Sequence, residues 1–201
     1  MVNRRREVLR FRIELLGIRP TIWRELLVPA SYSFWDLHVA LQDAMGWWDS
    51  HLHQFEVGED GAGGSVRIGI PVDEFDDDPD LLAGWEIAVL ECLDGPGSTM
   101  DYEYDFGDGW VHRLTYLGCE PREKGGRYPR CVAGERACPP EDCGGVGGYE
   151  HLVEALLDPS NPEHEELMEW IPRGWMPEGF SPEAVRFDSP SRRWKLAFED
   201  E

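Results

Sequence analysis

Three cysteines lie close together in one loop of the chain. Cys131, Cys138 and Cys143 fall within thirteen residues. Thiolates are preferred zinc ligands, and a histidine completes many tetrahedral sites of this kind. His112, on a strand expected just before the loop, is the fourth ligand that we predict, giving a zinc site of His112, Cys131, Cys138 and Cys143. The loop lacks the C-x2-C pair of most structural zinc sites, so a second interpretation stays open, in which the thiols are buried as small apolar groups.

Two histidines separated by one residue form a second group. His51 and His53 begin a segment, 51–57, whose alternation is typical of a strand. Alternate strand residues face the same side, so the two imidazoles would lie about 6.5 Å apart, on the side of the core. With Asp105 or Asp108 they could hold an ion or a polar substrate group, and either histidine could instead complete the cysteine site. The alternative is that both are hydrogen-bonded structural residues in an aromatic core.

The two aspartates belong to an aromatic hairpin. A three-residue turn, 107–109, would pair Phe106 with Trp110 and Tyr104 with His112, whereas a two-residue turn would place a carboxylate opposite the histidine. We favour the longer turn because it keeps the aromatic side chains on one face. That face would consist of Tyr102, Tyr104, Phe106, Trp110, His112 and Leu114. The candidate binding cluster is then His51, His53, Asp105, Asp108 and Trp110.

The elements that must position these residues begin with strands. Residues 8–15 alternate between apolar and polar, which predicts a half-buried strand, and residues 21–28 predict its hairpin partner. A helix is expected next, with Ser33 as its N-cap, Asp36 in its first turn and Gly46 at its end.

The later part of the chain is expected to be helical. Apolar spacing predicts helices near 149–156 and 161–171. Strands first and helices last favour an α+β fold, with a mixed or antiparallel sheet and a few packed helices. We expect one compact domain, 1–172, and a C-terminal arm, 173–201, that packs on the domain or extends from it.

The charge of the chain limits its partners. With 19 basic and 40 acidic residues, the formal net charge is -21 and the isoelectric point is near 4.5. Such a chain repels phosphate backbones, so direct nucleic-acid binding is not expected. Acidic DNA mimicry is an alternative, and it would require the carboxylates of 73–80 and 163–169 to form a stripe on one surface.

The compartment is inferred from the cysteines and the N-terminus. The five cysteines are odd in number, three share one loop, and no signal peptide is recognisable. No stretch approaches the roughly 18 uninterrupted apolar residues of a membrane span. We therefore expect a cytoplasmic protein with no membrane segment.

Several motifs together resemble the plasmid pRiA4b ORF-3-like family, a bacterial and archaeal group carried on plasmids and chromosomes. They are IRPTIWR (18–24), FWDLH (34–38), AMGWW (44–48), HLHQF (51–55), YDFGDGW (104–110) and the stretch from YPRC (128–131) to Gly148 and Tyr149. The resemblance spans roughly residues 7–158. It implies a compact α+β domain of uncharacterised function, and it supplies no established catalytic residues.

Two functions follow from these observations. The first is a non-enzymatic binding or accessory module, in which the aromatic face and the cysteine loop meet a protein partner and any zinc is structural. The second is a metal-dependent enzyme, hydrolase-like, that uses His51, His53, His112, Asp105 or the cysteines. A structural site would be closed by four protein ligands, whereas a catalytic site would keep an open coordination position beside a cleft.

Overall fold

The computed structural model describes residues 2–58, 64–71 and 80–199. The acidic patch at 73–80 falls mostly outside these residues. The carboxylate stripe that DNA mimicry would require depends on that patch.

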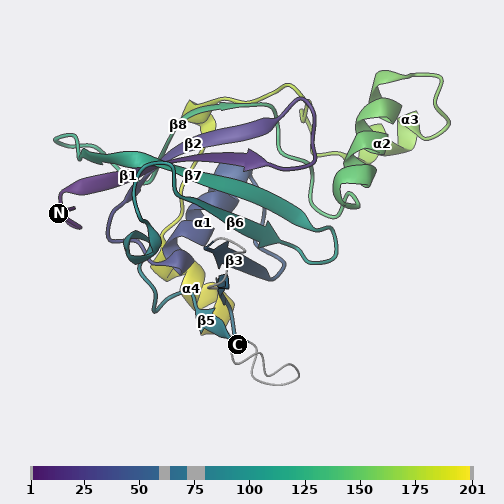
Figure 1. Ribbon diagram of the computed structural model, residues 1–201. Coiled ribbons are helices and arrows are strands. Elements are labelled where there is room, and N and C mark those ends of the chain that lie inside the picture. The colour runs from purple at the N-terminus through teal and green to yellow at the C-terminus, as the bar shows by residue number, and fades with distance from the viewer. Residues whose placement is uncertain (1, 59–63, 72–79, 200–201) are drawn as a thin grey trace.

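In the described residues, eight strands form one sheet in the order β5-β4-β3-β6-β7-β1-β2-β8 (Figure 1). Neighbouring strands are antiparallel except β4 and β5, which are parallel. The strands span Glu7–Leu15 (β1), Ile22–Pro29 (β2), His53–Val57 (β3), Val66–Gly69 (β4), Leu81–Ala83 (β5), Thr99–Tyr104 (β6), Trp110–Pro121 (β7) and Arg130–Glu135 (β8). The predicted α+β class with a mixed sheet is confirmed.

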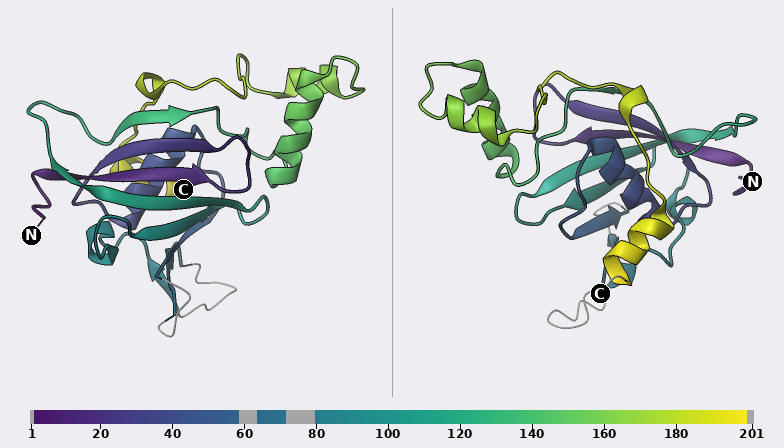
Figure 2. Two further views of the ribbon diagram at one scale, coloured as in Figure 1. Left: turned by 45° about the horizontal axis from the view of Figure 1, so that its top comes forward. Right: turned by 180° about the vertical axis from the view of Figure 1, so that it is seen from behind.

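The helices take three different places around this sheet. One helix, α1, lies against a face of the sheet, α2 and α3 form a pair that stands away from it, and α4 lies near α1 and β5 (Figures 1 and 2). The helical segments span Phe34–Met45 (α1), Val89–Cys92 (η1), Gly145–Leu157 (α2), His164–Trp170 (α3), Pro182–Ala184 (η2) and Pro190–Phe198 (α4). Within the described residues, no helix combines the length and the apolar character that a membrane span requires.

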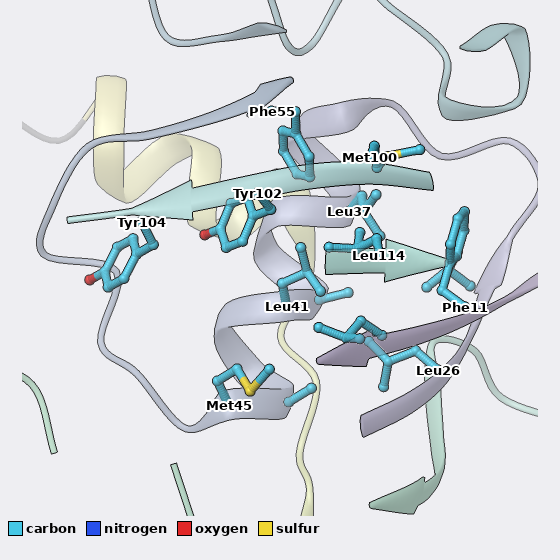
Figure 3. Close-up of a cluster of buried hydrophobic side chains, with 14 of the residues drawn as sticks. Phe11, Leu26, Leu37, Leu41, Met45, Phe55, Met100, Tyr102, Tyr104 and Leu114 are labelled. Atoms are coloured by element: carbon cyan, nitrogen blue, oxygen red, sulfur yellow. The ribbon is translucent and has the colours of Figure 1, made fainter. Parts of the chain in front are cut away.

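The core lies between α1 and the sheet. Figure 3 shows buried side chains of α1 together with buried side chains of the strands. It labels Leu37, Leu41 and Met45 from α1, and Phe11, Leu26, Phe55, Met100, Tyr102, Tyr104 and Leu114 from the strands. Each large apolar side chain buried in this way contributes about 1.5–3 kcal/mol to folding.

The predicted alternation of β1 is confirmed. Leu9, Phe11 and Ile13 are fully buried, while the intervening charged residues lie on the other face of the sheet. There Arg10 pairs with Glu25 of β2 and Glu120 of β7. The apolar and charged halves of the pattern therefore face the core and the outer surface, respectively.

The central hairpin has a different register from the one that we predicted. Tyr104 pairs with Trp110, and Tyr102 pairs with His112. The predicted pairing of Phe106 with Trp110 is wrong, because Phe106 lies outside both strands and is 50% exposed. The shift is by two residues, so the other aromatic side chains of the hairpin keep the face that we expected.

The difference arises at Asp105. Its backbone adopts the left-handed region, with φ of 55°, and its carboxylate accepts hydrogen bonds from the amides of Gly107 (2.9 Å) and Asp108 (3.3 Å). The amide of Gly109 donates to the Asp105 carbonyl at 2.6 Å. Aspartate tolerates this conformation and forms such turns readily. The turn is therefore wider than the three residues predicted, and Asp105 is part of it.

The predicted caps of α1 are confirmed. The Ser33 side chain accepts a hydrogen bond from the Asp36 amide, and the Asp36 carboxylate accepts one from the Ser33 amide. Gly46 ends the helix in the left-handed conformation, with φ of 88°. This reciprocal capping satisfies two backbone donors that the first turn would otherwise leave unpaired.

Replacing Ser33 with alanine should lower the free energy of unfolding by about 1 kcal/mol, because one helix donor loses its acceptor. Urea denaturation would measure the change. Ser31→Ala is the matched control, since Ser31 is exposed and precedes the helix. Equal losses in the two variants would show that the cap contributes no specific stability.

Candidate metal centre and adjoining groove

Three side chains from three separate loops converge at one end of the sheet. They are His51, just before β3, Asp105, just after β6, and Asp142, in the loop before α2. The His51 Nε2 atom lies 3.1 Å from Asp142 Oδ1 and 3.6 Å from Asp105 Oδ2. Within the described part of the chain, this is the one group of three or more His, Cys, Asp or Glu side chains whose ligand atoms all lie within 4.8 Å of one another.

Asp105 is held in place by its own turn. One carboxylate oxygen, Oδ1, accepts the hydrogen bonds from Gly107 and Asp108, and the other, Oδ2, faces His51. Asp142 also has a left-handed backbone, with φ of 58°. Both carboxylates therefore project from tight turns, and at Asp105 one oxygen stays available for a ligand.

A hydrogen-bond network joins the loop that carries His51 to the loop that carries Asp142. The Tyr104 hydroxyl donates to Glu141 at 2.7 Å and accepts from the Ser50 amide at 3.0 Å. The Glu141 carboxylate also accepts from the Trp48 amide at 2.9 Å. Burial, followed by the neighbouring Glu141, raises the pKa of Tyr104 far above its ordinary value. The phenol therefore stays protonated and remains a donor to Glu141.

One imidazole and two carboxylates form a donor set that suits a divalent transition-metal ion. The Asp142 side chain is 73% exposed and the His51 side chain 31% exposed. An ion held here would be reached by solvent, so positions of its coordination sphere would remain open. This differs from a structural zinc site, which four protein ligands close.

A groove of about 630 Å³ adjoins this group. It lies between the C-terminal end of α1, the loop 137–142 and the arm that follows α3, and both Trp48 and Asp142 line it. Trp48 is 79% exposed. The lining also includes seven other aromatic or proline residues, namely Trp47, Pro139, Pro140, Trp170, Pro172, Trp175 and Phe180, together with the charged residues Arg24, Asp43, Glu141 and Arg186.

The cysteines of the predicted zinc site have other surroundings. Cys138 is buried, and burial raises its pKa to about 12. Cys131 is also buried, and its thiol donates to the Ala133 carbonyl at 3.4 Å. In the described residues, no three of His112, Cys131, Cys138 and Cys143 have donor atoms within 4.8 Å of one another. Zinc binding by this set stays a prediction, and the structure does not bring its ligands together.

The second predicted cluster divides into two parts. His51 and Asp105 are brought together, but His53 is buried and stacks on His38, with ring centroids 3.5 Å apart. The expectation that both histidines face the core is wrong for His51, because β3 begins only at His53 and the preceding bend turns His51 outward.

The remaining members of that cluster have structural contacts. Trp110 is buried and packs near Trp47, with ring centroids 6.0 Å apart. Asp108 accepts a hydrogen bond from the Gly144 amide at 3.1 Å, which ties the hairpin turn to the start of α2. Sequence analysis missed Asp142, although it lies in the loop that we selected for its thiols, where Glu141 and Asp142 follow two prolines.

His112 is fully buried in the core. Its Nδ1 donates to the Tyr102 carbonyl at 3.3 Å, and its Nε2 has no hydrogen-bond partner among the described residues. Burial lowers the pKa of His112 to about 4. The side chain is therefore neutral at pH 7 and has a structural role in this conformation.

Stability should fall as the pH drops from 6.5 toward 4. In this window the unfolded chain, with a histidine pKa near 6.5, takes up a proton at position 112 that the folded chain does not. His112 alone would account for a slope of at most about 1.4 kcal/mol per pH unit, and this contribution is fully present above pH 6.5. Urea denaturation at several pH values should show a shallower slope for His112→Gln, whose amide can still donate to Tyr102. The exposed His151→Gln variant should keep the wild-type slope, and equal slopes in all three proteins would contradict the assignment.

Comparisons with known proteins agree with this architecture. The family described as plasmid pRiA4b ORF-3-like protein matches residues 7–185. An uncharacterized protein, y4hQ of Sinorhizobium fredii (strain NBRC 101917 / NGR234), is 35% identical over 164 residues, which cover 81% of this chain and 80% of that protein. The crystal structure of a protein of unknown function, MM3350 from Methanosarcina mazei Go1, is similar with a TM-score of 0.81 and 36% identity, over 90% of this chain and 99% of that one. From its sequence motifs and its fold alike, the chain belongs to the plasmid pRiA4b ORF-3-like family.

Proposed function

We propose that this domain is a metal-dependent binding module, in which His51, Asp105 and Asp142 hold a divalent ion that a ligand in the groove completes. The convergence of three donor side chains from three loops carries the proposal. Because these are three ligands and not four, an oxygen atom of the bound molecule can take an open position. The ion would then be part of the binding surface.

The ligand that we propose is a basic polypeptide segment of a partner protein. The groove is large enough for several side chains, and its aromatic and proline lining suits a peptide. The net charge of -21 favours a basic partner and disfavours nucleic acid. A carbonyl or carboxylate oxygen of the segment would coordinate the ion. We also propose that this association takes place in the cytoplasm, because the five cysteines are all free thiols and thiols stay reduced in that compartment.

A second function, metal-dependent hydrolysis, is favoured by the Tyr104–Glu141 pair. An ion with an open position can lower the pKa of a bound water, and a nearby carboxylate can move the proton. Glu141 is tied to the same loops as the donor set. Metal-dependent turnover of chromogenic esters or phosphates, lost in Glu141→Gln, would support hydrolysis. If none of these substrates is turned over, hydrolysis is refuted and the binding function is retained.

Isothermal titration with Mn²⁺ and with Zn²⁺ tests the donor set. Purified metal-free protein should bind at least one of these ions at one site. His51→Ala and Asp142→Asn should each weaken metal binding by more than about 100-fold, because each removes a direct ligand. Loss of a residue that only hydrogen-bonds a metal ligand already lowers metal affinity by about 10–100-fold. Asp105→Asn should also weaken binding, and asparagine tolerates the left-handed backbone at this position.

The matched control is His151→Ala, which removes a histidine from an exposed pair with Glu163, at 2.6 Å, outside the donor set. This variant should bind like the wild type. A wild-type protein that binds neither ion, or a His51 variant that binds normally, would refute the proposal. Loss of zinc in Cys138→Ser alone would place the site in the cysteine loop instead.

A further inference from the structure

We infer that Arg193, on the C-terminal helix α4, is a positioning residue for the metal centre. This inference rests on the proposed function, because it concerns what controls the affinity of that site. Arg193 touches none of the three proposed ligands. It acts through Asp49, which lies two residues before His51.

The guanidinium of Arg193 bridges two segments that border the site. Its Nη1 lies 3.0 Å from Asp49 Oδ2, and its Nη2 lies 2.9 Å from Asp43 Oδ1 in α1. Its Nε lies 3.7 Å from Asp188, which precedes α4. The Arg193 side chain is only 17% exposed, and those of Asp43 and Asp49 are nearly buried. Ion pairs shielded in this way are much less screened than surface pairs, and removing one partner leaves buried charge unpaired.

Asp49 is held from both sides. Its Oδ1 lies 2.7 Å from Nε2 of the buried His38, while Oδ2 meets Arg193. Its backbone is in the left-handed region, with φ of 62°, a conformation that aspartate tolerates at a single position. The chain from this point leads through Ser50, whose amide donates to Tyr104, to His51. The path of the backbone from Asp49 to His51 therefore depends on contacts that include Arg193.

The rest of α4 is attached mainly by aromatic contacts. Trp194 packs edge-on against Trp35 and Trp85, with ring centroids 5.5 and 5.0 Å apart, and Phe198 also packs against Trp35. No residue of α4 is fully buried. The helix also lies beyond residue 185, where the family match ends. The C-terminal segment thus contributes a cation to a loop of the family domain.

The neighbouring arginine offers a matched control. Arg192 is on the same helix, is 71% exposed, and pairs with Asp188 alone among the acidic residues described. Mutation of Arg192 should change the charge of α4 by the same amount without affecting Asp49. Arg193→Lys keeps a cation but loses the two-pronged geometry, so its effect should be intermediate.

The test is Mn²⁺ and Zn²⁺ titration of full-length wild type, Arg193→Ala, Arg193→Lys and Arg192→Ala, with amide hydrogen exchange on the metal-free proteins. Arg193→Ala should bind the ion about tenfold more weakly, a loss of affinity similar to that caused by mutating residues that hold metal ligands in place. Its Ser50 amide should exchange faster, while the amides of β1 stay protected and show that the fold is intact. Arg192→Ala should match the wild type in both measurements.

The outcomes separate this inference from the proposed function. A wild-type protein that binds neither ion would refute the metal centre, and it would also refute the positioning role of Arg193. Wild type that binds, together with Arg193→Ala that binds equally well and protects Ser50 equally, refutes the positioning role alone. Equal weakening in Arg192→Ala would also refute it, because the effect would then be one of general charge.

Discussion

The hydrogen bond from the Tyr104 hydroxyl to Glu141 holds together the parts of the molecule on which the candidate site depends. Tyr104 ends β6, and Glu141 lies in the loop before α2. The same phenol accepts from Ser50, and the same carboxylate accepts from Trp48, so the segment leading to His51 is fixed as well. Together with the hydrogen bonds from the Gly144 amide to Asp108 and from the Asp105 amide to the Leu52 carbonyl, this junction ties the three ligand-bearing loops to one another. Burial keeps the Tyr104 phenol protonated at neutral pH, so it remains a donor to Glu141.

The elements that are best predicted from the sequence are those whose signals are local. The alternation of β1 and the caps at Ser33 and Gly46 lie within a few residues of the elements that they define, and both are confirmed. The register of the hairpin was wrong because the wide turn depends on the carboxylate and left-handed backbone of Asp105. Local alternation also extended β3 too far back, to His51.

The candidate metal centre could be predicted only in part. His51 and Asp105 were selected because histidines and carboxylates gather near the aromatic hairpin. Asp142 was missed because its proximity is a tertiary contact between residues far apart in the chain, and a loop of three thiols suggested zinc ligands instead of carboxylates. The structure places Cys138 and His112 in buried surroundings that disfavour their charged forms. Burial separates the titratable residues of this region into a structural group and an accessible group, and sequence alone does not reveal burial.

Anomalous diffraction would locate an ion bound by His51, Asp105 and Asp142. Crystals of the metal-free protein would be soaked in Mn²⁺ or Zn²⁺ and measured at the absorption edge of that metal. We predict one strong peak about 2.0–2.2 Å from His51 Nε2 and from carboxylate oxygens of Asp105 and Asp142, with further density on the side of the groove. A peak among Cys131, Cys138 and Cys143, or no peak at this end of the sheet, would refute the proposed metal centre.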